Sequence, residues 1–402
     1  MDVRGKMESQ QPNRIAFQFI ILLGIVSLLA DMTYEGARSL TGPYLAVLGA
    51  SAGVVGLVSG VGEFLGYALR LLSGYLGDRK KAYWQLTFAG YGLLISVPLL
   101  AFAGYWQFAA VLIILERMGR GIRTPSRDTM LSYATKQVGR GLGFGIHEAL
   151  DQTGAIIGPL LLSAVFLLKG GYREGFTILW IPALLSIAFL VVARTRFPSP
   201  EKLESSDKSG QQTIPPSAGL PRLFWFYALF IFLSVAGFAH FQLISYHLKV
   251  HSVVSDAQIP VFYAIAMGVD ALVALLIGKT YDKIGLMSLL TLPLLTLPIP
   301  FFAFSFRYEF VVISVVLWGA VMGTHETIMR AAIADLTPIE RRGFAYGIFN
   351  TIYGVSWFIG STLMGFLYEM NVGYLILFAV LMEVISIPAF LLLRKSIAKS
   401  AQ

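Results

Sequence analysis

The chain has 402 residues, of which 56% are hydrophobic and 13% are charged, with a mean hydropathy of +0.70 and a formal net charge of +8. Because a soluble domain carries about 25% charged residues, this composition excludes an ordinary water-soluble domain and indicates a protein whose solvent is lipid. The sequence has no cysteine, which excludes disulfides, thiolate metal sites and thiol redox chemistry.

Apolar stretches separated by short polar breaks run along the whole chain. Each is long enough to cross about 30 Å of hydrocarbon as a helix, and the alternation expected of barrel strands is absent. Since unpaired backbone groups are too costly in lipid, we predict an all-α membrane protein with twelve transmembrane helices. The predicted spans are 15–42, 52–76, 82–103, 107–132, 141–168, 175–195, 223–248, 257–281, 286–304, 308–335, 343–367 and 372–394.

The basic residues predict the orientation of these helices. Of the 31 Lys and Arg, 20 fall in segments or at span ends on the side of the two termini, 4 in the opposite loops, and 7 in the interior of predicted spans. Cytoplasmic loops carry such an excess, so both termini are expected in the cytoplasm of a multi-pass protein of the cell (inner or plasma) membrane. Orientation accounts for the net charge, and we expect no nucleic-acid partner.

The spans divide into two related halves. Residues 196–222 are rich in Pro, Ser and charge, which predicts a cytoplasmic linker between a six-helix bundle at 1–195 and another at 223–402. Three pairs of segments repeat in the same order in both halves: Gly74–Asp78 with Gly278–Asp282, Arg123–Arg127 with Glu326–Arg330, and Arg140–Ile146 with Arg342–Ile348. Two pseudo-symmetric bundles predict a transporter with its site between the halves.

Charged side chains inside the spans are the main functional signal, because each is costly in lipid unless it is paired or faces water. Helical spacing puts several of them on shared faces. The candidates for substrate binding and proton coupling are Asp31, Glu35, Arg38, Glu63, Arg117, Arg120, Arg123, His147, Asp151, His325, Glu326 and Arg330. Asp31, Glu35 and Glu326 are the leading proton carriers, with Arg117 and Arg123 as tuning charges. The alternative is structural pairing, which we favour for Arg70, Arg127, Asp128 and Asp335.

The five histidines all lie in or beside predicted spans. Imidazole together with carboxylate suits divalent transition metals, so His147, His240, His247 and His325 are candidate metal ligands, although no metal site is assigned. Hydrogen-bonded helix contacts or a proton relay are the alternative roles of these side chains.

The segments Gly74–Lys81 and Gly278–Gly285 resemble the glycine-to-aspartate loop motif of the major facilitator superfamily, and Arg117–Gly121 is similar to its intramembrane arginine motif. Gly145, Gly154 and Gly158-Pro159 have the spacing of its antiporter motif, although Leu161-Leu162 replaces the closing double glycine. The strings at 29–35, 73–79, 117–128 and 145–159 resemble a bacterial and archaeal efflux subgroup that includes drug-type exporters and nickel/cobalt-resistance permeases.

This resemblance implies gating residues. Asp78 would cap the helix that starts near Gly343 and Asp282 the helix that starts near Gly141, which would lock an inner gate. The gating candidates are Gly74, Asp78, Arg79, Gly278, Asp282, Lys283, Gly154, Gly158 and Pro159.

We therefore expect a secondary active transporter that works by alternating access, is not an enzyme and needs no cofactor. A proton-coupled exporter (antiporter) of small organic solutes is the first hypothesis. A divalent-metal exporter of the nickel, cobalt or iron type is the alternative, followed by an uptake symporter and by a membrane receptor or lipid-handling enzyme. The expected partners are a small-molecule or ion substrate, protons and the lipid bilayer, with the chain acting as a monomer.

Overall fold

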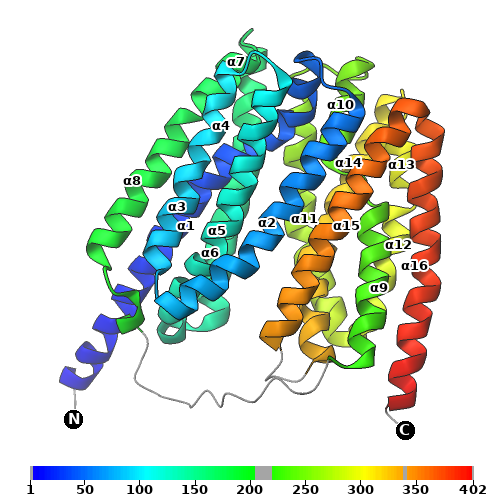
Figure 1. The fold of residues 1–402 in the computed structure, drawn as a ribbon. Helices are drawn as coiled ribbons and strands as arrows, with labels where there is room; N and C mark the ends of the chain where they lie inside the picture. The colour runs from blue at the N-terminus through cyan, green and yellow to red at the C-terminus, as the bar shows by residue number, and fades with distance from the viewer. Residues whose placement is uncertain (1–2, 204–219, 338–341, 401–402) are drawn as a thin grey trace. The chain divides into compact units, whose positions relative to one another are not determined.

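A computed structural model describes residues 3–203, 220–337 and 342–400, and all the regular structure in these ranges is helical (Figure 1). The helices up to residue 203 are α1 (Val3–Val47), α2 (Ala52–Lys80), α3 (Tyr83–Gly92), η1 (Leu93–Ile95), α4 (Ser96–Leu99), η2 (Leu100–Phe102), α5 (Trp106–Val138), α6 (Arg140–Leu167), α7 (Tyr172–Ile178), α8 (Trp180–Arg196) and η3 (Pro200–Leu203). The later helices are α9 (Arg222–Gly237), α10 (Phe241–Val250), α11 (Gln258–Ile284), η4 (Gly285–Leu290), α12 (Thr291–Thr296), α13 (Ile299–Ala303), α14 (Tyr308–Leu336), α15 (Arg342–Met370) and α16 (Val372–Ser400).

Nine helical segments within the described ranges are long and apolar enough to cross a membrane. One of them, Gln258–Ala303, covers the two predicted spans 257–281 and 286–304. The predicted spans 107–132 and 343–367 lie in α5 and α15, which are not among the nine. The chain is therefore a multi-pass membrane protein, and its count of twelve spans stays a prediction.

Four predicted spans are interrupted in the structure, among them 175–195, which is divided between α7 and α8 at Leu179. The spans 82–103 and 286–304 are divided into short α and 3-10 segments that contain Pro98, Pro293 and Pro300, residues that cannot donate a helical hydrogen bond. The span 223–248 breaks between α9 and α10, where Phe238 and His240 have extended backbone. The Trp318 indole donates to the Ala239 carbonyl at 3.0 Å. This backbone carbonyl, which lies outside both helices, therefore has a hydrogen-bond partner.

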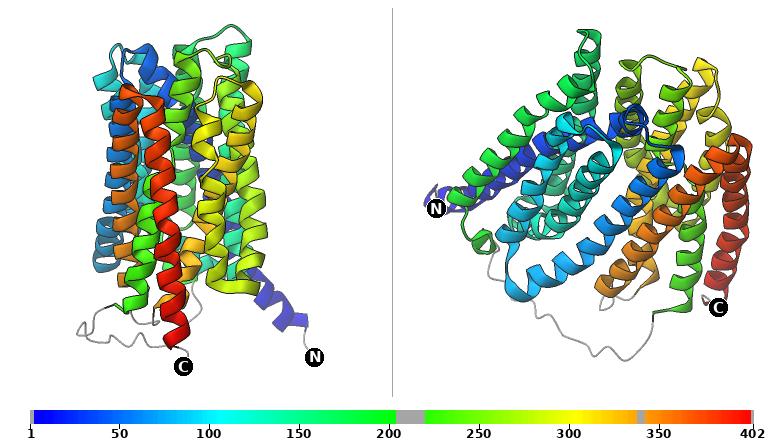
Figure 2. Two further views of the ribbon diagram at one scale, coloured as in Figure 1. Left: turned by 90° about the vertical axis from the view of Figure 1, so that its right-hand side faces the viewer. Right: turned by 45° about the horizontal axis from the view of Figure 1, so that its top comes forward.

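The first compact unit, unit 1, consists of Met1–Ala37, Leu69–Ala103 and Val111–Gln211. Helices α5 and α6 flank α1 here, and α3 and α8 lie beside each other (Figures 1 and 2). Gly154 of α6 has no side chain to separate it from the Leu28 carbonyl of α1, and Gly90 of α3 meets Gly119 of α5 in the same way. These close approaches bring the polar faces of α1, α5 and α6 together.

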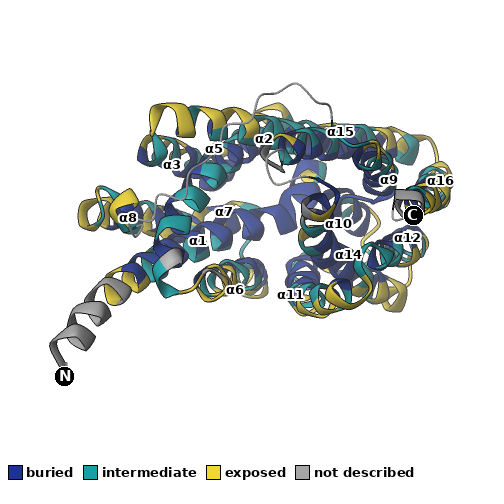
Figure 3. Ribbon diagram, turned by 90° about the horizontal axis from the view of Figure 1, so that it is seen from below, coloured by how far each residue is buried: buried dark blue, intermediate teal, exposed yellow. Residues whose placement is uncertain are grey.

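The second compact unit, unit 2, consists of Arg38–Ala68, Gly104–Ala110 and Gln212–Gln402. Helix α11 packs along α14, and α9 lies between α15 and α16. The first part of α2 runs beside α15 (Figure 3). Unit 2 thus takes two segments from the predicted first half. The predicted linker 196–222 includes residues 204–219, which lie outside the described residues, so the domain division at 195 and 223 stays a prediction.

Large apolar side chains are exposed along the outer faces of several helices (Figure 3). They include Ile181, Leu184 and Leu185 on α8, Leu272, Leu275 and Leu276 on α11, and Leu377, Leu381, Val384, Leu391 and Leu392 on α16. Contiguous apolar surface of this kind is unusual on soluble monomers and fits contact with lipid tails.

Candidate functional site

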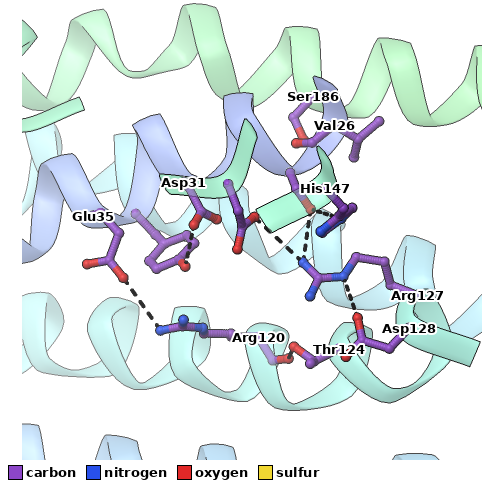
Figure 4. Close-up of polar contacts among 12 residues, drawn as sticks. Val26, Asp31, Glu35, Arg120, Thr124, Arg127, Asp128, His147 and Ser186 are labelled. Atoms are coloured by element: carbon purple, nitrogen blue, oxygen red, sulfur yellow. Dashed lines mark hydrogen bonds and ion pairs between the residues drawn. The ribbon is translucent and has the colours of Figure 1, made fainter. Parts of the chain in front are cut away.

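A cluster of acids and arginines lies between α1 and α5 in unit 1, and Figure 4 shows its members Asp31, Glu35 and Arg120. We call Asp31, Tyr34, Glu35, Arg120 and Arg123 the acid–arginine cluster. The first three residues occupy one face of α1 because they are three or four positions apart. The two arginines occupy neighbouring turns of α5. Close packing of α1 on α6 at Gly154 and Gly158 fixes the position of this face.

The two carboxylates of the acid–arginine cluster have different partners. Asp31 is 5% exposed, and its Oδ2 accepts a hydrogen bond from the Tyr34 hydroxyl at 2.9 Å. Glu35 is also 5% exposed, and its Oε1 lies 3.6 Å from Nη1 of Arg120. Asp31 therefore accepts from a neutral hydroxyl, whereas Glu35 is paired with a guanidinium. A nearby positive charge favours the ionised form of a carboxyl group more strongly than a neutral donor does.

The ring of Tyr34 also stabilises both arginines. The Arg120 Cζ lies 4.7 Å from the ring centroid and the Arg123 Cζ lies 5.3 Å from it. Arg123 is 2% exposed and also contacts the ring of Tyr91 on α3, at 4.9 Å. Cation–π contacts of this kind let a guanidinium stay charged with little water around it.

Arg127 is the centre of a second group of contacts on α5, one turn or more from Arg120 and Arg123 (Figure 4). Its Nε donates to Asp128 at 2.9 Å, and its Nη1 donates to the Ser27 hydroxyl at 2.9 Å and lies 3.9 Å from Asp151. The Ser27 hydroxyl also hydrogen-bonds His147 Nε2 at 3.1 Å. The structure thus brings the predicted neighbours His147 and Asp151 together through Arg127 and Ser27.

Unit 2 contains a separate polar group. Arg38 donates through Nη2 to Glu63 Oε1 at 3.0 Å, and His240 Nε2 lies 3.7 Å from the same oxygen. The His240 ring meets the Trp357 ring at a centroid distance of 4.8 Å. The Arg38 guanidinium and the His240 ring thus both approach the Glu63 carboxylate of α2.

The structure also gives neighbours for two of the remaining coupling candidates. Arg117 is buried beside Glu116, with 3.5 Å between Nε and Oε2. His325 Nδ1 lies 3.3 Å from the Tyr353 hydroxyl. Glu326 is exposed on α14, and the side chain of Arg330 lies outside the described residues.

The gating candidates stand at the ends of α2 and α11 and along α6. Asp78 accepts from the Tyr83 hydroxyl at 3.2 Å and Arg79 donates to Tyr75 at 3.1 Å, while Asp282 and Lys283 are exposed. Gly74 and Gly278 contact Pro125 and Thr327, and Pro159 continues α6 after Gly158. Their gating roles remain predictions.

Four side chains that contact the candidate site residues were not predicted from the sequence. They are Ser27, Tyr34, Tyr91 and Trp357. Tyr34 could have been found, because it is three residues after Asp31 on the same face. Tyr91 and Trp357 come from other helices, and a single sequence gives no sign of that pairing.

The four candidate metal ligands have different neighbours. His147 contacts Ser27, His240 lies near Glu63, His247 bonds the Tyr368 hydroxyl at 2.8 Å, and His325 meets Tyr353. Among the side chains that the structure describes, no three His, Cys, Asp or Glu lie close enough together to hold a metal ion.

Comparison with protein families gives a match that spans most of the chain. A family model described as Major Facilitator Superfamily matches residues 23–360 and again residues 286–402. The chain belongs to the major facilitator superfamily. A member of this superfamily is a membrane transporter, and secondary transport is consistent with this assignment.

Relatives of this superfamily member have no more specific description. An uncharacterized protein of Mycobacterium tuberculosis is 41% identical over 393 residues, which cover 97% of this chain and 96% of the relative. An uncharacterized MFS-type transporter of Methanocaldococcus jannaschii is 26% identical over 381 residues, covering 91% and 92%. These relatives support the family without indicating a substrate.

Solved structures of the superfamily share the fold. The nucleoside transporter NupG has a TM-score of 0.69 at 16% identity, covering 94% of this chain and 98% of that one. A POT family transporter in complex with a thioalcohol-conjugated peptide has a TM-score of 0.71 at 14% identity, covering 95% and 96%. A bacterial homolog of the human lysosomal transporter Spinster has a TM-score of 0.66 at 14% identity, covering 94% and 96%. At these identities the likeness shows the fold alone.

Proposed function

We propose that this chain is a proton-coupled exporter of small organic solutes that works by alternating access. The observation that carries the proposal is the acid–arginine cluster, in which two buried carboxylates lie on one face of α1 against the arginines of α5. An ionised carboxylate that has left water is costly, and binding a proton removes that cost. Asp31 and Glu35 are therefore the proposed proton-binding groups.

Exchange of proton for solute follows from competition at these carboxylates. With Glu35 ionised, Arg120 is held in an ion pair; once Glu35 takes up a proton, that guanidinium gains freedom to bind a polar group of the solute. A solute that needs an ionised carboxylate expels the proton instead. Either order couples the two ligands, because each changes the charge that the other meets.

We also propose that the remaining coupling candidates contribute to solute binding. They are Arg38, Glu63, Arg117, Arg123, His147, Asp151, His325, Glu326 and Arg330. The Arg38–Glu63 pair is the best supported of them, since it combines a hydrogen bond with burial of the guanidinium. Arg127 and Asp128 are proposed to be structural.

The proposed architecture has twelve spans in two six-helix bundles, 1–195 and 223–402, joined by 196–222 with both termini in the cytoplasm. The bias of Lys and Arg toward one side supports this orientation. We place the protein in the cell membrane as a monomer, since each chain would contain its own pathway. Gly74, Asp78 and Arg79 with Gly278, Asp282 and Lys283 are the proposed inner gate, and Gly154, Gly158 and Pro159 the flexible part of α6.

The test is solute-driven proton movement in proteoliposomes that contain the full chain and a pH-sensitive dye. The panel contains organic cations, organic anions, nucleosides, short peptides and divalent nickel, cobalt and iron. Nucleosides and peptides are included because structurally similar transporters are named for them. We expect at least one organic solute to move protons, and we expect Asp31→Asn and Glu35→Gln each to reduce that flux at least tenfold.

A fluorescent protein fused to the C-terminus first checks the orientation in cells. We expect it to lie on the cytoplasmic side of the membrane.

In the proton-flux assay, Glu309→Gln is the matched control, because Glu309 is an exposed carboxylate on α14 outside the acid–arginine cluster. Proton flux driven by metals alone would replace the proposal with the metal-export alternative. Solute uptake without any proton movement would contradict the coupling.

A further inference from the structure

At the N-terminus of α2, the neighbouring residues of the chain do not supply a hydrogen-bond acceptor for every backbone N–H group. The first turn of a helix leaves backbone N–H groups without helical partners. The Ser51 hydroxyl accepts from Val54 N at 3.4 Å, and the Ser51 carbonyl accepts from Val55 N at 3.0 Å. The N–H of Gly53 comes one residue before these donors, and neither group of Ser51 accepts from it.

A carboxylate from another helix supplies the missing acceptor. Glu369, in the last turn of α15, accepts the Gly53 N–H through Oε1 at 2.6 Å. The two residues are 316 positions apart in the chain and both belong to unit 2. A carboxylate at a helix N-terminus gains both a hydrogen bond and attraction to the helix dipole. The contact therefore ties the start of α2 to the end of α15.

Small residues continue this contact along both helices. Gly53, Gly56 and Gly60 lie on one face of α2, where an added Cβ would meet atoms of Phe366, Ser361 and Phe358 of α15, in that order. Gly365 of α15 in turn lies against the Ala52 carbonyl. We call this contact the α2–α15 seam. The glycines let the two backbones approach closely between residues 53 and 60. Beyond Gly60 the contact becomes aromatic, with Phe64 against Phe358 and Tyr67 against Tyr353.

We propose that Glu369 is a latch that holds the α2–α15 seam closed and has to release Gly53 each time the transporter opens at this end. The inference rests on the proposed alternating-access cycle and on the proposed orientation, in which this end faces the outside. Glu369 is suited to the role because it is exposed at the rim of the seam, where water can replace it as the Gly53 partner. A buried latch would have no such replacement and would open far less readily.

The absence of cysteine from the chain allows a direct test. Thr362→Cys places a thiol in the seam, because the Thr362 hydroxyl is buried and lies next to the position that a Cβ added at Gly60 would take. The rate at which a membrane-impermeant thiol reagent, added outside intact cells, labels this thiol measures how often the seam opens. We expect Glu369→Ala to raise the rate by about three- to tenfold, the effect of losing a helix-capping contact. Glu369→Gln loses the charge but keeps an oxygen that can accept from Gly53, so it should raise the rate less.

Two control variants separate a latch from a general loss of structure. Ser51→Ala removes the cap that α2 supplies to itself and leaves the tie to α15 in place, so the labelling rate should change less than about twofold. Glu309→Gln removes an exposed carboxylate from the first turn of α14 and should also leave the rate unchanged. Folding of every variant is checked by its elution as a single monodisperse peak in detergent.

An unchanged labelling rate in both Glu369 variants would overturn the latch, as would an equal increase in Ser51→Ala. The assay needs neither a solute nor a proton gradient. Its outcome is therefore separate from that of the proton-flux experiment, and a transporter that proves not to be proton-coupled could still show the latch.

Discussion

Arginines on the same helix have different surroundings, and this decides the role that each can have. Arg120 faces an acid that can be neutralised by a proton, and its other contact is the soft face of Tyr34. Arg127 donates to Ser27 and Asp128 and approaches Asp151, so its contacts are divided among three partners. We propose that Arg120 changes partners when Glu35 takes up a proton, and that Arg127 is a fixed link between α1, α5 and α6.

Loss of Arg127 should therefore reduce stability. Arg127→Met leaves the buried Ser27 hydroxyl without its guanidinium donor and Asp151 without its nearby cation, which costs about 1–3 kcal/mol. A lower midpoint of thermal unfolding in detergent is the expected result. Asp128→Asn removes the acid that lies nearest to Arg127. Because this carboxylate is 45% exposed, the midpoint of thermal unfolding should hardly change. Equal effects of the two substitutions would contradict the structural assignment of Arg127.

Helical spacing predicted which residues share a face but not which residues pair. Asp31 with Glu35, and His147 with Asp151, lie together because a helix brings every third or fourth residue to one side. Pairing between helices depends on packing, and for this reason Glu35 lies against Arg120 while Arg38 bonds Glu63. Nothing in a single sequence distinguishes these pairs from the other combinations of the same charges.

At the scale of the element, glycine has two different roles on α6. An added Cβ at Gly154 would collide with the Leu28 backbone of α1, whereas the space around Gly145 is open to 4 Å. Both glycines belong to the motif that resembles the antiporter signature. Gly154 therefore lets α1 and α6 pack closely, whereas an added Cβ at Gly145 would meet no neighbouring atom.

These two positions should respond oppositely to the same substitution. Gly154→Ala should destabilise the protein by about 1–3 kcal/mol, because α1 and α6 have to separate or distort. Gly145→Ala should be neutral or stabilise by up to about 1 kcal/mol through helix propensity. Thermal midpoints of both variants, measured in one detergent, check the pair. Equal destabilisation would show that the α1–α6 contact does not depend on the Gly154 position.

The spans 82–103 and 286–304 were predicted as continuous helices, although the sequence carries a local signal for their interruptions. Pro98 and Pro293 lie in the interrupted segments, so those interruptions could have been anticipated. The break at Phe238–His240 has no proline, and the indole of Trp318 from another helix stabilises it. Such a tertiary hydrogen bond overrides local helix propensity and cannot be found from the segment itself.

At the scale of the whole molecule, composition predicted a membrane protein, the repeated segments a transporter of two related halves, and the resemblance of the motifs the major facilitator superfamily. The superfamily match and the solved structures confirm that prediction. Substrate and coupling are not determined by the fold, since one fold hosts many functions and the site residues decide among them. The proposal of proton coupling therefore depends on Asp31 and Glu35, and it is best tested by separating solute movement from proton movement.

The most direct measurement compares two modes of transport in Glu35→Gln proteoliposomes, with the organic solute that gives the strongest proton signal. Exchange of labelled for unlabelled solute needs no net proton movement, whereas accumulation against a gradient needs the proton. We predict that exchange is largely retained and that proton-driven accumulation falls at least tenfold. Retention of proton-driven accumulation at the level of the parent protein would contradict the assignment of the proton to the acid–arginine cluster.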